Sequence, residues 1–425
     1  MYKLKKTPSG LNLLTVPMAG AKTTAILVMV ATGSKHETRK TSGLSHFLEH
    51  MFFKGTAKRP NALILSSELD KLGGEYNAFT SKEYTGYWIK TAANQIKPAI
   101  EVVADMLLNS KFDAEEIKRE SGVIVEEVNM YLDNPIMRLE DVFEELLYGD
   151  TPAGWDTIGT KKNILSFKRK DFVDYFKSQY RAESTFVCLA GKLPADSEKL
   201  LASTFKAYAK GKAKKKVVTK EYQSKPAVKI EFKKTDQAHL SLGVRTMPFG
   251  AKETVALKVI ATILGGSMSS RLFSQLRERN GLCYYVRSGN EGYSDTGYLA
   301  TKAGVPVDKI EKAIGIIIAE YKRIAKEKIS DSELEKIKQF ISGRIMLSLE
   351  SPDDIAGWYA NQLVINHQQP KKLKLVTPED FLHEIKKISA NDIQRVAQKI
   401  FDPKKLNLAI IGPYTDPKKF EKLLK

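Results

Sequence analysis

The pattern of apolar and polar residues along the chain predicts a mixture of strands and helices. Short runs rich in β-branched and aromatic residues predict strands, and apolar positions repeating every three or four residues predict amphipathic helices. In the first half, the expected strands are 2–7, 11–17, 23–32, 75–80, 83–92 and 185–190. The expected helices are 43–53, 62–72, 96–108, 114–132, 139–147 and 170–179.

The second half of the chain repeats motifs of the first in the same order. Leu69–Gly74 is echoed by Leu276–Gly281, and Thr85–Ala92 by Thr296–Ala303, half a chain length later. This self-similarity predicts an α+β protein of two duplicated α/β domains, each a mostly antiparallel sheet packed with helices. A Lys-rich, polar stretch ends the first copy. We therefore expect domains at 1–210 and 227–425, joined by a linker at 211–226.

The expected helix at 43–53 carries the pattern His46-Phe47-Leu48-Glu49-His50. Positions i, i+3 and i+4 share one face of a helix, so His46 and His50 can converge on one ion with Glu49 beside it. Ser42 is a candidate N-cap for this helix, and Gly55 lies where a left-handed stop is expected.

This spacing indicates metal chemistry. A hydrolytic zinc site takes three protein ligands and leaves one position open for water. A second carboxylate, not bound to the metal, can then accept the proton of that water, and this order of residues is typical of one class of zinc hydrolases. The alternative is a pair of ordinary core histidines. With only six histidines in the chain, a chance match to the full pattern is rare, which favours the metal.

The expected helix at 114–132 offers the third ligand. At about 100° per residue, one face of this helix points toward the core; it is formed by Ile117, Ser121, Ile124, Val128 and Tyr131. Glu120 and Glu127 lie together on one edge of that face, whereas Glu126 points to solvent. Glu127 is therefore the better ligand, and Glu120 a supporting carboxylate. The alternative is three solvated glutamates on a helix edge.

Composition limits where the protein works and what it binds. There is no run of eighteen apolar residues, no apolar core to a secretory signal and only two cysteines, so we expect no membrane span and a cytoplasmic location. The net charge of +18 would suit nucleic acid or an acidic ligand. The lysines are scattered and accompany no groove-reading motif, which favours a solvated surface and no nucleic acid partner.

Four stretches together resemble the pitrilysin-type, or inverzincin, zinc metallopeptidases, along nearly the whole chain. The similarity is to the small-subunit branch that includes mitochondrial processing peptidase and bacterial processing proteases. The stretches are Gly43–Thr56, Gly74–Thr80, Glu120–Glu127 and Leu276–Tyr284. The resemblance implies zinc on His46, His50 and Glu127, with Glu49 as general base and Glu120 as the supporting carboxylate.

The resemblance also implies where the substrate binds. Asn77, Ala78 and Phe79 fall on an edge strand that pairs with the backbone of an extended peptide. Arg277 and Tyr284 in the second domain would hold substrate carbonyls and donate to the developing oxyanion. The alternative for these last two is surface and strand packing.

The expected function is a zinc endopeptidase, with one Zn²⁺ per chain, that cleaves short or unfolded peptides in an enclosed chamber. Family members build this chamber from four such domains, so a two-domain chain implies half of a clamshell and a dimer. A homodimer and a heterodimer with a metal-free paralogue are both compatible with the sequence, with Arg277 and Tyr284 acting in their own chain or in the partner. A non-catalytic structural or assembly subunit is the alternative function.

Overall fold

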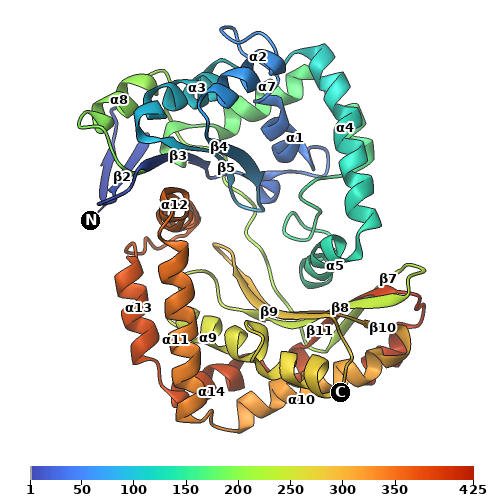
Figure 1. Ribbon diagram of the computed structural model, residues 1–425. Coiled ribbons are helices and arrows are strands. Elements are labelled where there is room, and N and C mark those ends of the chain that lie inside the picture. The colour runs from blue at the N-terminus through green and yellow to red at the C-terminus, as the bar shows by residue number, and fades with distance from the viewer. Residues whose placement is uncertain (1) are drawn as a thin grey trace. The chain divides into compact units, whose positions relative to one another are not determined.

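The computed structural model describes residues 2–425, which form two compact units (Figure 1). Unit 1 comprises the chain up to Asn129 together with Asp156–Val217 and Leu347–Leu375. Unit 2 comprises Met130–Trp155, Val218–Met346 and Val376–Lys425. Each unit contains one sheet and the helices that cover it, so the predicted fold class of two α/β domains is confirmed.

Unit 1 is built on a six-stranded sheet in the order β1-β2-β6-β3-β5-β4. Its strands are β1 (Lys3–Lys6), β2 (Asn12–Pro17), β3 (Thr23–Val30), β4 (Glu75–Thr80), β5 (Thr85–Ala92) and β6 (Thr185–Gly191). All neighbouring strands are antiparallel except β2 and β6, which are parallel. The central strands β3 and β6 are buried almost throughout, so both faces of the sheet are covered there.

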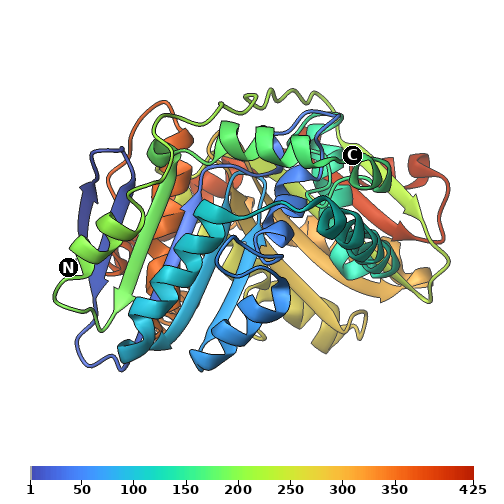
Figure 2. The same ribbon diagram turned by 90° about the horizontal axis from the view of Figure 1, so that it is seen from above.

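The helices of unit 1 cover the two faces of its sheet. They are α1 (Leu44–Met51), α2 (Ala62–Lys71), α3 (Ile96–Asn109), most of α4 (Ala114–Asp133), α6 (Lys161–Ser166), α7 (Arg169–Gln179), α8 (Ser197–Thr204) and α12 (Pro352–Gln368). Helix α3 packs on β5 and β3 (Figure 2). The apolar face of α3 is buried. Helix α1 contacts edge strand β4 and helix α7.

Unit 2 repeats the strand order of unit 1 in a five-stranded sheet, β7-β11-β8-β10-β9. Its strands are β7 (Ala227–Phe232), β8 (Gln237–Thr246), β9 (Tyr285–Gly292), β10 (Gly297–Pro306) and β11 (Asn407–Gly412). Numbered along the chain, β2 to β6 and β7 to β11 both follow the order first, last, second, fourth, third. The shared order is the structural counterpart of the sequence repeat.

One face of the unit 2 sheet is covered by several helices around a continuous apolar core. The remaining helices of the unit are α9 (Thr254–Gly265), α10 (Ile310–Lys326), α11 (Asp331–Ser348), α13 (Pro378–Lys387), α14 (Ala390–Ile400) and α15 (Pro417–Glu421). The other face is covered by α5 (Pro135–Tyr148), which packs on β11, β8 and β7.

The compact units depart in two places from the division at 211–226 expected from the repeat. Helix α5 comes from the first half of the chain but packs on the second sheet. Helix α12 comes from the second half but packs on β3 and β6 of the first sheet. Each half therefore contributes one amphipathic helix to the unit built mainly from the other half. Among residues 2–425, every helix is too short or too polar to cross a bilayer.

Candidate metal centre

Helix α1 begins at a carboxylate rather than at the predicted serine cap. The N-cap residue is Gly43, with φ of 96°, which has no side chain to accept a hydrogen bond from the first turn. Instead, the carboxylate of Glu37 accepts hydrogen bonds from the N–H groups of Gly43 (2.8 Å) and Ser45 (2.6 Å). The prediction of Ser42 as N-cap was wrong, because a side chain from outside the helix occupies the donors that Ser42 would have used.

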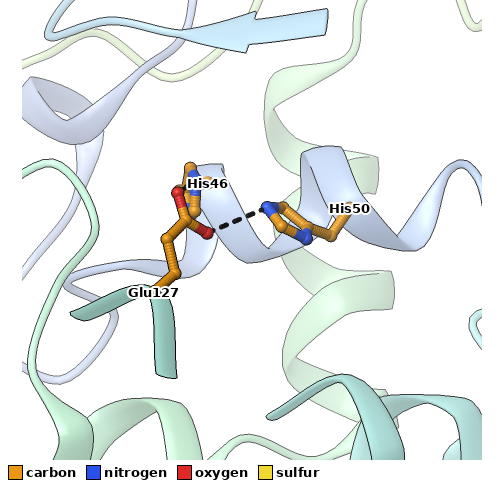
Figure 3. Close-up of side chains that lie close together, drawn as sticks. All are labelled: His46, His50 and Glu127. Atoms are coloured by element: carbon orange, nitrogen blue, oxygen red, sulfur yellow. Dashed lines mark ion pairs between the residues drawn. The ribbon is translucent and has the colours of Figure 1, made fainter. Parts of the chain in front are cut away.

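Helix α1 presents His46 and His50 to Glu127 of helix α4 (Figure 3). His46 Nε2 lies 3.6 Å from one carboxylate oxygen of Glu127, and His50 Nε2 lies 3.5 Å from the other. One ligand atom from each residue lies within 4.8 Å of the other two. Within residues 2–425, this is the only group of three His, Cys, Asp or Glu side chains arranged in this way.

The donor set fits a catalytic zinc ion. Two imidazole nitrogens and one carboxylate oxygen are typical zinc ligands, and three protein ligands leave a position for water or substrate. All three side chains are partly accessible, as a reacting site requires. Burial alone would raise the pKa of Glu127, but its close contact with His46 and the attraction of both histidines hold that pKa below its usual value. Glu127 is therefore ionised, as a ligand must be.

A second layer of charged groups supports His50. Its Nδ1 lies 2.9 Å from Glu120, whose other oxygen lies 2.5 Å from the ammonium group of Lys54. Burial opposes the ionised form of Glu120, but the hydrogen bonds from His50 and Lys54 lower its pKa overall. With Nδ1 engaged by Glu120, Nε2 of His50 is free to face the metal group. By contrast, Nδ1 of His46 is buried and has no hydrogen-bond partner among residues 2–425.

Glu49 lies on the same helix but remains outside the ligand group. It is only 9 % exposed, and its carboxylate accepts a hydrogen bond from the hydroxyl of Thr80 at the end of β4. Burial raises the pKa of Glu49 above its usual value, against the opposing effects of Thr80 and the two histidines. A carboxylate with a raised pKa is suited to taking a proton and returning it.

The residues expected to bind substrate lie on β4, the edge strand of the first sheet. Asn77, Ala78 and Phe79 pair with β5 on one side, and within residues 2–425 no strand pairs with the other edge of β4. The ring of Phe79 lies over Gly86, where any side chain would collide with it. The hydrogen bond from Thr80 to Glu49 connects this strand to helix α1. The substrate role of these residues stays a prediction.

Arg277 and Tyr284 contact each other in unit 2. Arg277 lies on a π-helical turn, η4 (Phe273–Arg279), and its guanidinium group stacks 5.2 Å above the ring centre of Tyr284. The same group donates a hydrogen bond to the carbonyl oxygen of Tyr284 (3.2 Å). Tyr284 is 79 % exposed, so its ring and hydroxyl are available. These contacts establish a pair of side chains within unit 2, and their catalytic roles stay predictions.

Sequence reasoning assigned no role to three supporting residues, Glu37, Lys54 and Thr80. Lys54 lies four residues after His50, a spacing that was a usable signal for a neighbour on the same side of the chain. Glu37 lies in an irregular segment before the helix, and no periodicity relates it to Gly43 and Ser45. Its position is set by the path of the loop, which local patterns do not encode.

Comparison with known proteins identifies the family of the chain. The family model described as Insulinase (Peptidase family M16) matches residues 14–161, and that described as Peptidase M16 inactive domain matches residues 166–341. An uncharacterized zinc protease of Bacillus subtilis, YmxG, is 33% identical over 97% of this chain and 98% of its own length. An uncharacterized zinc protease of Rickettsia felis is 30% identical over 97% of this chain and 98% of its own.

Solved structures show the same fold. A protease from Helicobacter pylori superposes with a TM-score of 0.89 at 25% identity, covering 97% of this chain and 99% of that one. A Pseudomonas fluorescens protein described as a peptidase M16 inactive domain has a TM-score of 0.89 at 20% identity, with 98% of both chains covered. With the metal group, the sheet order and these relatives in agreement, the chain belongs to peptidase family M16, the insulinase or pitrilysin type, and its near relatives are named zinc proteases.

Proposed function

We propose that this chain is a zinc endopeptidase that hydrolyses short or unfolded peptides, with one zinc ion per chain. The observation that carries the proposal is the convergence of His46, His50 and Glu127 from two helices, with Glu49 held beside them. Three ligands with an open fourth position, and a separate carboxylate to accept a proton, suit metal-assisted hydrolysis at neutral pH. The relatives are named zinc proteases, which supports a zinc-dependent protease in general terms.

The roles of the residues follow from their positions. His46, His50 and Glu127 would hold the zinc ion, whose Lewis acidity would polarise a substrate carbonyl and acidify a bound water. Glu49 takes the proton of the attacking water and returns it to the leaving amine. The open edge of β4 binds the peptide backbone with little demand on side-chain identity, which suits unfolded substrates.

Arg277 and Tyr284 complete the proposed mechanism. The guanidinium group holds substrate carbonyls, and the exposed phenol donates a hydrogen bond to the oxyanion that develops at the scissile carbon. Because Arg277 already contacts the ring and carbonyl of Tyr284, the two act as one unit. We propose that this unit serves the metal group of its own chain or of a partner in a dimer.

The replacement Glu49→Gln tests the proposal. Glutamine cannot accept the proton, so turnover of a fluorogenic peptide falls by at least about a hundredfold, as for loss of a general base. Because Glu49 is not a ligand, elemental analysis finds zinc in the variant as in the wild type. A chelator abolishes wild-type cleavage, and added zinc restores it. Cleavage by the variant at the wild-type rate, or wild-type cleavage that survives the chelator, contradicts the mechanism.

A dimer and a cytoplasmic location are further parts of the proposal. Two units per chain supply half of the four domains that the family resemblance leads us to expect around a chamber. Light scattering at micromolar concentration gives twice the chain mass for a homodimer, whereas a partner subunit co-purifies in a heterodimer. A monomer that cleaves peptides at full rate contradicts both forms. Cell fractionation tests the location.

A non-catalytic assembly subunit is the second candidate. A chain of Complex III2 from Candida albicans superposes with a TM-score of 0.82 at 16% identity, which shows a shared fold alone. A subunit of that kind has no need of a complete site. Here His46, His50 and Glu127 lie together, Glu120 contacts His50, and Glu49 is present on the same helix as the two histidines. Purified protein without zinc and without peptidase activity would favour the second candidate.

A further inference from the structure

The start of the metal helix is held by groups that the proposed mechanism does not use. Glu37 is 3 % exposed, and its two oxygens bond separately to the N–H groups of Gly43 and Ser45. Ser45 directly precedes His46, so these bonds fix the backbone of the first turn that carries a ligand. A carboxylate at the N-terminus of a helix is also favoured by the helix dipole.

Two other contacts fix the same turn. The hydroxyl of Ser45 lies 2.6 Å from the hydroxyl of Tyr175 on α7, which in turn lies 3.0 Å from that of Thr32 after β3. Gly43 lies so close to the chain at Ile158 that an added Cβ would be 2.7 Å from its carbonyl oxygen. The first turn of α1 is therefore held from three sides, whereas His46 has no hydrogen bond at its own Nδ1 among the described residues.

His46 and His50 differ in how their rings are oriented, and this difference makes the position of the first turn of α1 important. His50 is oriented directly, through the bond from Nδ1 to Glu120. Among residues 2–425 no hydrogen-bond partner orients His46 through Nδ1, so the backbone beneath it sets its position. Metal ligands must be placed to within a few tenths of an ångström, about 0.2 Å from ideal distances. A shift of the first turn would therefore misplace His46 before it affected His50.

We infer that Glu37 is a positioning residue of the metal centre, which holds the first turn of α1 so that His46 faces His50 and Glu127. This inference rests on the proposed function, since it assumes that the three side chains bind zinc. Glu37 touches neither the ligands nor the substrate, and it acts through the backbone of Gly43 and Ser45.

A glutamate is required here for reasons of length and number of acceptors. A carboxylate offers two acceptor oxygens, one for each N–H, whereas the amide of glutamine offers one acceptor and a donor that repels the second N–H. Aspartate is one methylene shorter and cannot span both donors from the same backbone position. Burial raises the pKa of Glu37 to about 7, with the two backbone bonds and the charge of Lys82 opposing that rise. The protein thus keeps a group that is costly to bury.

The variant Glu37→Gln, purified as the full chain, tests the inference through zinc affinity, measured by competition with a chromophoric chelator. We expect affinity to fall by about tenfold, the lower end for loss of a supporting partner. Cobalt substituted for zinc gives a second reading, because its visible spectrum reports ligand geometry. The spectrum of the variant shifts from that of the wild type, and Glu37→Asp, which keeps one bond, lies between them.

The matched control is Glu253→Gln. Glu253 is also a buried glutamate at the start of a helix, α9, but it belongs to unit 2 and is paired with Lys399 at 2.9 Å. This control lowers the melting temperature and leaves zinc affinity and the cobalt spectrum unchanged. If Glu37→Gln does not fold, Tyr175→Phe removes the neighbouring support of Ser45 and is expected to weaken zinc binding by a smaller factor.

The outcomes separate the inference from the function on which it rests. A wild type that binds no zinc refutes the proposed function. A wild type that binds zinc, with Glu37→Gln binding it equally tightly and with the same cobalt spectrum, refutes the positioning role alone. Equal losses of zinc affinity in Glu37→Gln and Glu253→Gln also refute it, because general destabilisation then explains both.

Discussion

Removing the carboxylate of Glu120 tests how much the groups behind the ligands contribute to metal binding. Glu120 accepts a bond from His50 Nδ1 at 2.9 Å and pairs with Lys54 at 2.5 Å, and it is nearly buried. Glu120→Gln keeps an acceptor for His50 but loses the charge that faces Lys54. Glu120→Ala loses both bonds and leaves the half-buried ammonium group of Lys54 without this partner.

The size of the effect follows from these contacts. Losing the outer partner of a metal-bound histidine costs about tenfold to a hundredfold in metal affinity, which is about 1.4 to 2.7 kcal/mol. Since the amide retains one bond, we place Glu120→Gln near tenfold and Glu120→Ala near a hundredfold. The pKa of Glu120 is lowered by its partners against the effect of burial. The ionised form is therefore the one that both variants remove.

The assay is chelator competition at constant pH and ionic strength, with unfolding monitored by circular dichroism. Glu126→Gln is the control, because Glu126 lies on the same helix, is exposed, and accepts a hydrogen bond from the side-chain amide of Asn129 (3.1 Å), away from the metal group. This control retains wild-type affinity. If Glu120→Ala binds zinc as tightly as Glu126→Gln, the ion is not held at His50, and the assignment of the metal centre fails.

Three further predictions concern proton balance and backbone strain. Folding raises the pKa of Glu37 from 4.5 to about 7. Protonated Glu37 therefore contributes fully to the free energy of unfolding below pH 4.5, and this contribution is lost as the pH rises through about 7. Relative to Glu37→Gln, the wild type loses about 3 kcal/mol of unfolding free energy between pH 4 and 8, measured by urea titration; a constant difference contradicts this. Thr80→Val removes a hydrogen bond that lowers the pKa of Glu49, so the acid limb of kcat/KM moves to higher pH, and an unmoved limb contradicts the role of Glu49. Gly43→Ala forces a Cβ to 2.7 Å from a carbonyl oxygen at φ of 96° and costs about 1 to 3 kcal/mol by thermal denaturation, more than Gly20→Ala, whose φ is 81° but whose surroundings are open.

Local patterns predicted the secondary structure of this protein and the three side chains that come together as a candidate metal group. Strand β4 lies at Glu75–Thr80 and helix α4 at Ala114–Asp133, where 75–80 and 114–132 were expected. The helical period also separated Glu127, which faces the histidines, from the exposed Glu126. These features were accessible because side-chain direction along a helix or strand repeats with a fixed period. A ligand group on two regular helices can therefore be worked out from spacing.

Tertiary structure alone decided how these elements are shared and supported. The exchange of α5 and α12 between the halves of the chain depends on which buried helix face fits which sheet, and the residues of either helix alone do not reveal that choice. Likewise, the bond from Thr80 to Glu49 depends on where an edge strand meets a helix more than twenty residues away.

The start of helix α1 shows most clearly what local sequence patterns could not predict. A serine before a helix is the usual cap, and the local pattern therefore pointed to Ser42. The protein instead brings Glu37 back through an irregular loop, so that a buried carboxylate takes two N–H groups of the first turn. Spacing along the chain determined which side chains could bind the metal. The path of the loops, set by packing of distant segments, determined what holds those side chains in place.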